Sequence, residues 1–251
     1  MSGHSKWSKI KRKKGANDNR RSMVFTKLIK EITISAKLGG TDPAGNARLY
    51  LAIQNAKSQN MPKENIERAI KKGGDKDTAN FQELTFEGYG PGKVAIFVEA
   101  STDNLNRTVS NVRKYFSKMG GSLSTNGTFE FIFNQKGIIE FNLPTGKDAD
   151  ELTLELIDAG AEDVDIEDGE AEVTTAREDF GAVYKKLKEL SIETESANLV
   201  RIPKIFKKLD LHEFKKAMQL IETIEEDEDV QNVYHNIEMT EELAGLYESE
   251  N

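Results

Sequence analysis

The segment DVDIEDGEAEVTT, residues 163–175, carries the clearest structural signal in the chain. Two short runs of alternating apolar and polar residues meet at Asp168-Gly169, and this dipeptide favours the tight turn of a β-hairpin. We therefore expect strands near residues 163–167 and 170–175, paired with each other.

Sequence on both sides of this hairpin is helical. The capping box Asp148-x-x-Glu151 opens the preceding helix, which Gly160 ends, and Thr175-x-x-Glu178 forms a second box that opens the following helix. With a strand before the first helix and another after the second, residues 136–201 follow the order βαββαβ, which is typical of a ferredoxin-like domain.

Strand and helix patterns also occur on both sides of residues 136–201. We predict strands at 84–87, 94–99 and 129–133 with a helix at 104–119, then strands at 202–207 and 230–235 with a helix from 210. We infer that these two halves pair around the central unit, so that residues 81–135 and 202–240 form one discontinuous domain. The 136–201 domain is then an insertion in it.

Three aromatic residues in the predicted strand 129–133 allow two interpretations. Phe129, Phe131 and Phe133 would share one face of the strand, as base-stacking residues do in an RNA-recognition sheet. The basic and glycine residues of that motif are missing, so we expect a core face.

The N-terminal region is helical. Apolar residues recur at helical spacing in three segments between residues 22 and 75, and Pro62 and Gly73-Gly74 mark the start and end of the third. The predicted fold class is thus α+β: an N-terminal three-helix domain followed by two ferredoxin-like-type α/β domains, one inserted into the other.

Charge is strongly segregated along the chain. Residues 1–80 contain 18 Lys and Arg against 7 Asp and Glu, a net of +11, whereas residues 81–251 contain 17 against 36, a net of −19. A basic end on an acidic protein favours contact with a polyanion. Nucleic acid is the first candidate.

Residues 1–21 are too poor in apolar side chains to fold alone, so we predict a basic flexible arm. The cations that we expect to contact phosphate lie in this arm, in the third helix and on the helix at 104–119: Lys6, Lys9, Lys11, Arg12, Lys13, Lys14, Arg20, Arg21, Lys63, Arg68, Lys71, Lys72, Arg107 and Lys114. For the helical cations, a purely solvated surface is the alternative.

Several other classes of site find no support. The chain has no cysteine and its three histidines are far apart, so we predict no metal site and no cofactor. Gly88-x-Gly90-x-Gly92 has the wrong spacing for dinucleotide binding, and no nucleophile motif is present. We expect a protein that is not an enzyme, has no membrane segment, lies in the cytoplasm and is a monomer.

Longer motifs resemble one known family. GHSKWSKIKRKK, NMPKENIERAIKKGG, EGYGPGKVAIFVE, TDNLNRT and RKYFSKMGG together are similar to the YebC family of probable transcriptional regulators. The resemblance is near-continuous over residues 2–140 and implies a cytoplasmic, non-enzymatic protein of three domains. It also implies DNA binding and transcription regulation, although the family's mitochondrial relatives are regarded as translational activators.

Three functions follow as hypotheses. The first is a DNA-binding regulator of transcription, and the second is a ribosome-associated translation factor that binds ribosomal RNA. The third is a protein-interaction scaffold whose basic end binds an acidic protein. Charge alone does not separate DNA from RNA, because both display phosphate.

Overall fold

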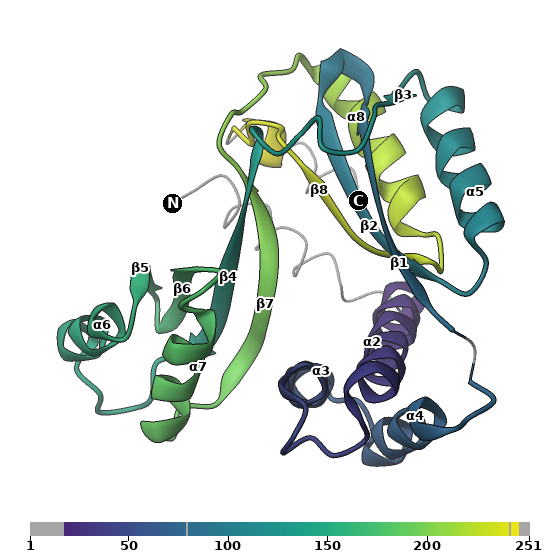
Figure 1. Ribbon diagram of the computed structural model, residues 1–251. Coiled ribbons are helices and arrows are strands. Elements are labelled where there is room, and N and C mark those ends of the chain that lie inside the picture. The colour runs from purple at the N-terminus through teal and green to yellow at the C-terminus, as the bar shows by residue number, and fades with distance from the viewer. Residues whose placement is uncertain (1–17, 79, 241, 246–251) are drawn as a thin grey trace. The chain divides into compact units, whose positions relative to one another are not determined.

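The computed structural model describes residues 18–78, 80–240 and 242–245 (Figure 1). These residues divide into two compact units. One contains the described residues up to 27, residues 80–134 and the described residues from 202 onward, and the other contains 28–78 and 135–201. The predicted arm lies outside the described residues as far as residue 17. Residues 18–21, the last four of the predicted arm, instead form the start of the first described helix.

Three helices form the N-terminal region, as the periodicity predicted: α2 (Asp18–Gly39), α3 (Ala47–Ser58) and α4 (Lys63–Gly74). The connection before α3 is fixed by Asn46, whose side-chain oxygen accepts a hydrogen bond from Leu49 N at 3.1 Å. Its amide nitrogen donates to the carbonyls of Ser35 and Gly40. One side chain thus caps α3 and satisfies carbonyls near the end of α2.

Helix α4 packs closely on α2. Ile66, Ala69 and Gly73 form its buried stripe, and the Thr33 hydroxyl donates to the Ala69 carbonyl at 3.4 Å. A methyl group on Gly73 would lie 2.5 Å from the Thr33 carbonyl oxygen and 2.6 Å from the Ala36 Cβ. The glycine therefore permits the close approach of the two helices.

Replacement of Gly73 with alanine should lower the free energy of unfolding by about 1–3 kcal/mol, because the added methyl group meets backbone and cannot be accommodated by a rotamer change. Chemical denaturation followed by circular dichroism measures this. Gly181→Ala is the matched control, since its methyl group would meet nothing within 4 Å and alanine favours the helix by up to about 1 kcal/mol. Equal stability of the two variants would refute the close-packing role of Gly73.

The sheet of the inserted region has the strand order β5-β6-β4-β7. Its elements are β4 (Phe133–Asn142), α6 (Ala149–Asp158), β5 (Ala161–Glu167), β6 (Glu170–Ala176), α7 (Phe180–Glu189) and β7 (Thr194–Pro203). The second, third, first and fourth strands of the unit thus lie side by side, which is the ferredoxin-like arrangement. Helices α6 and α7 contribute Leu152, Leu156, Val183 and Leu187 to its core.

The hairpin at Asp168-Gly169 is confirmed, with Glu167 paired to Glu170 and φ angles of 53° and 85° at the two turn residues. The cap at Asp148 is confirmed as well, because its carboxylate accepts from Asp150 N and Glu151 N. The second capping box was wrong. Strand β6 continues through Thr175 to Ala176, and α7 begins only at Phe180.

The other sheet has the order β3-β1-β2-β8. Its elements are β1 (Gln82–Tyr89), the 3-10 turn η1 (Pro91–Lys93), β2 (Ala95–Thr102), α5 (Leu105–Lys118), β3 (Ser122–Leu123), α8 (Leu211–Glu225) and β8 (Val230–His235). In the inserted unit, β6 precedes the second helix and lies between β5 and β4. In this sheet β1, the first strand of the domain, takes the corresponding position between β3 and β2. The strands on either side of the insertion therefore complete one sheet.

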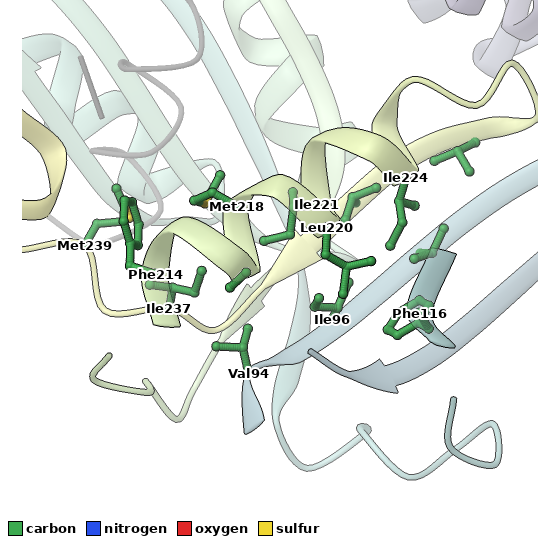
Figure 2. Close-up of a cluster of buried hydrophobic side chains, with 14 of the residues drawn as sticks. Val94, Ile96, Phe116, Phe214, Met218, Leu220, Ile221, Ile224, Ile237 and Met239 are labelled. Carbon is green, nitrogen blue, oxygen red and sulfur yellow. The ribbon is translucent and has the colours of Figure 1, made fainter. Parts of the chain in front are cut away.

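Both helices of this domain cover the same face of the sheet (Figure 1). Figure 2 shows Val94 and Ile96 directed toward α8, where Phe214, Leu220 and Ile221 meet them. Alternate β2 residues therefore supply the main core, and the opposite face of β2 carries a smaller cluster with Phe97.

Two predicted strands were wrong. Residues 129–132 form a turn in which Phe133 N and Ile132 N both donate to the Phe129 carbonyl, and the buried Glu87 carboxylate holds this turn by accepting from Gly127 N and Phe129 N. Phe129 and Phe133 are consequently buried while Phe131 is exposed. The predicted strand 202–207 contains the end of β7 and one isolated bridge from Lys207 to Ile237.

Candidate nucleic-acid interface

Four predicted contact residues lie together on α4. Lys63, Arg68, Lys71 and Lys72 are all exposed, and at about 100° per residue they occupy the half of the helix opposite its buried stripe. We call this set the α4 basic face. Its side chains can reach a surface presented to the helix without disturbing the packing on α2.

Ion pairing within α4 leaves most of this charge available. Lys63 Nζ lies 3.5 Å from Glu67 Oε1, with side chains 88% and 62% exposed. Within the ranges that the structure describes, Arg68, Lys71 and Lys72 form no salt bridge. An exposed pair such as Lys63–Glu67 contributes little and is readily exchanged for a phosphate.

The remaining N-terminal candidates lie outside what the structure describes. Lys6, Lys9, Lys11, Arg12, Lys13 and Lys14 precede residue 18, and Arg20 and Arg21 fall in the first turn of α2, where only the backbone is described. Their contact with nucleic acid stays a prediction.

Arg107 occupies a structural position. Its guanidinium donates to Asp229 through Nε at 3.0 Å and through Nη2 at 2.8 Å and 2.7 Å, and Nη2 also donates to Asp103 at 2.9 Å. Hydrogen bonds to Asp229 first, and then to Asp103, raise the pKa of Arg107. Asp229 is buried, so this guanidinium neutralises an interior charge and is already engaged.

A second carboxylate completes the connection between α5 and the turn before β8. Asp227 accepts from the Asn111 amide at 3.0 Å and from the Tyr115 hydroxyl at 2.9 Å, and from Asp229 N at 2.9 Å. Burial, followed by the hydrogen bond to Asp227, raises the pKa of Tyr115 to about 12. One stripe of α5, formed by Arg107, Asn111 and Tyr115, is therefore bonded to the turn before β8.

Lys114, in contrast, is exposed on α5, with Lys118 exposed one turn further along. These two lysines remain able to meet a phosphate. Helices α4 and α5 belong to different compact units, so each carries its own candidate surface.

Sequence reasoning missed one exposed segment that carries both cations and apolar side chains. This segment is residues 204–208, KIFKK, and most of it fell in the predicted strand 202–207, but Ile205 and Phe206 are 51% and 41% exposed. Three lysines within five residues, without an intervening acid, were a signal available in the sequence.

The part of the chain that the structure describes contains no candidate metal site and no candidate membrane span. Among residues 18–78, 80–240 and 242–245, His, Asp and Glu side chains form no group of three able to hold a metal ion. Over the same residues, no helix combines the length and apolar character needed to cross a bilayer.

Comparison with known proteins gives matches along nearly the whole chain. The model for the TACO1/YebC protein N-terminal domain matches residues 5–76, and the model for the TACO1/YebC second and third domain matches residues 81–237. A protein of Amoebophilus asiaticus named probable transcriptional regulatory protein is 52% identical over 239 residues, which cover 94% of this chain and 98% of that protein. A Treponema denticola protein of the same name is 49% identical, covering 96% and 98%.

A solved structure is similar as well. The crystal structure of a conserved hypothetical protein from Aquifex aeolicus superimposes with a TM-score of 0.78 at 41% identity, covering 89% of this chain and 93% of that one. The fold described above is thus also seen in a crystal.

Proposed function

The chain belongs to the TACO1/YebC family, and from that premise we propose that it is a nucleic-acid-binding regulator of gene expression. Its bacterial relatives are named probable transcriptional regulatory proteins, which supports DNA as the polyanion and transcription as the process. The proposal includes a cytoplasmic location, a monomeric state and no catalytic activity.

The α4 basic face is the observation that carries this proposal. It presents Lys and Arg side chains on a helix whose opposite side is fixed in a core, so the cations have a defined spacing. Each phosphate that they neutralise releases condensed counterions, and this supplies affinity that depends strongly on salt. Lys114 and the predicted arm would add further phosphate contacts.

One feature favours the second candidate, a translation factor that binds ribosomal RNA. The most exposed side chains of α4 are Lys, Arg and Glu. Its one amide side chain of the kind that reads adenine in the major groove, Asn65, is only partly exposed. A surface that contacts only phosphate recognises shape, and structured RNA is commonly bound in this way.

Ultraviolet crosslinking in growing cells, with sequencing of all recovered DNA and RNA, tests the proposal. Enrichment of promoter DNA is the expected result, and enrichment of defined ribosomal RNA segments would instead establish the translation candidate. A variant with Arg68, Lys71 and Lys72 changed to glutamine is the control. If the wild-type protein recovers no more nucleic acid than this variant does, binding through α4 is refuted and a protein scaffold is favoured.

A further inference from the structure

An exposed aromatic and cationic surface lies on the sheet domain that contains β1, β2 and β8. We define the Phe131/Phe206 surface as Phe131, Lys204, Ile205, Phe206, Lys207 and Lys208. Phe131 is 58% exposed, and Ile205 and Phe206 are among the other exposed large apolar side chains. Exposed phenylalanines beside apolar neighbours are uncommon on a protein surface and indicate an interaction site.

Backbone hydrogen bonds bring the two parts of this surface together. Lys204 N donates to the Ile132 carbonyl at 2.7 Å, which places the segment 204–208 beside the residue that follows Phe131. The segment that carries Phe206 therefore begins beside the turn that carries Phe131, although the two are far apart in the sequence.

The backbone beneath these side chains is firmly held. Asn236 donates from its amide to the Ile205 carbonyl at 3.0 Å, Lys207 N donates to the Asn236 carbonyl at 2.7 Å, and Glu238 N donates to the Lys207 carbonyl at 2.9 Å. Since the main chain is ordered before any ligand arrives, binding costs little additional conformational entropy.

The charge of the surface favours an anionic partner. The surface carries three lysines, Lys204, Lys207 and Lys208, against two carboxylates: Glu130, which is exposed and precedes Phe131 in the sequence, and Glu238, whose oxygen lies 3.8 Å from Lys208 Nζ. The Lys208 side chain remains 82% exposed. The segment is thus locally cationic within a region of the chain that carries a net −19.

We propose that the Phe131/Phe206 surface binds unpaired bases of a single-stranded nucleic acid, with the phenyl rings stacking on bases and Lys204 and Lys208 contacting phosphates. Aromatic side chains interleaved with cations are the general means by which proteins hold single strands without reading their sequence. Buried duplex bases offer no free face to these rings. The inference deepens the proposed function and rests on it for the presence of nucleic acid.

The test compares binding of the full chain to a fluorescent 12-nucleotide oligouridylate, the matching oligodeoxythymidylate, and an RNA duplex of equal length. Phe131→Ala or Phe206→Ala alone should weaken single-strand binding about 5- to 150-fold, the range for loss of one stacked base. The alanine pair should weaken it further and change duplex binding less than about 2-fold. Phe131→Trp with Phe206→Trp should retain single-strand affinity because tryptophan also stacks. Equal single-strand loss for the RNA and DNA probes supports base stacking as the shared chemistry.

Controls separate stacking from altered folding. Leu154→Ala with Ile157→Ala removes exposed apolar side chains, 66% and 42% exposed on α6, and should leave binding unchanged. Lys204→Gln with Lys208→Gln should lower the salt slope by about 0.7 for each phosphate contact on a single strand, whereas the alanine pair at the phenylalanines leaves the slope unchanged.

Unchanged single-strand binding by the alanine pair would overturn the inference and favour a protein partner at this surface. Equal loss on single strand and duplex would overturn it too. Variants of the α4 basic face test the proposed function separately. If these variants bind every probe as the wild type does, α4 does not bind nucleic acid and the proposed function fails. The effect of the phenylalanine pair is measured independently of that result.

Discussion

Replacement of Arg68, Lys71 and Lys72 with glutamate should weaken binding to duplex DNA or structured RNA about 30- to 150-fold near physiological salt, if each cation contributes about 0.7–1 kcal/mol through counterion release. The slope of log K against log salt should fall by about 0.9 for each lost contact with a duplex. Fluorescence anisotropy titrations at several salt concentrations measure both quantities. The loss should be similar for different sequences, because phosphate contacts carry no base information.

The chain offers a control with the same change in net charge. Lys147, Lys185 and Lys216 are exposed lysines outside α4, and their replacement with glutamate also changes the charge by six. A general electrostatic effect would reduce binding equally in both variants, and this result would remove α4 from the interface. A loss confined to the α4 variant would localise the contact.

The arm requires its own comparison. Changing Lys11, Arg12, Lys13 and Lys14 to glutamate and combining this with the α4 variant shows whether the two segments contribute independently. Independent phosphate contacts should reduce the salt slope additively, since each releases its own counterions.

Local signals in the sequence were sufficient for much of the fold. Asp168-Gly169 specifies its turn through two residues that tolerate positive φ, and Asp148 caps α6 with a bond to residues two and three positions away. The α4 basic face was predictable for the same reason, because helical spacing decides which of its side chains are exposed.

Features that depend on distant residues were not predictable. Glu87 holds the turn at Phe129 from more than 40 positions away, so the alternating phenylalanines suggested a strand that does not form. A capping-box pattern at Thr175 occurs within a strand because pairing with β4 extends β6 to Ala176. Likewise, nothing local to Arg107 shows that its partner is Asp229.

Asp229→Ala should lower the free energy of unfolding by about 1–3 kcal/mol, because it removes the buried carboxylate that accepts hydrogen bonds from both the Arg107 guanidinium and the Thr108 hydroxyl. Thr108 Oγ1 donates to Asp229 Oδ2 at 2.8 Å, and the Asp229 side chain is only 5% exposed. Urea denaturation followed by circular dichroism checks the prediction.

Asp103→Ala is the matched control, since Asp103 accepts from the same guanidinium at 2.9 Å but is 46% exposed. A surface pair of this kind contributes about 0–1 kcal/mol, so Asp229→Ala should be the more destabilising of the two alanine variants. If Arg107 instead served mainly to contact nucleic acid, Arg107→Ala would weaken nucleic-acid binding with little loss of stability. We expect the reverse: a marked loss of stability, with affinity nearly unchanged while the variant remains folded, because the guanidinium is committed to Asp229.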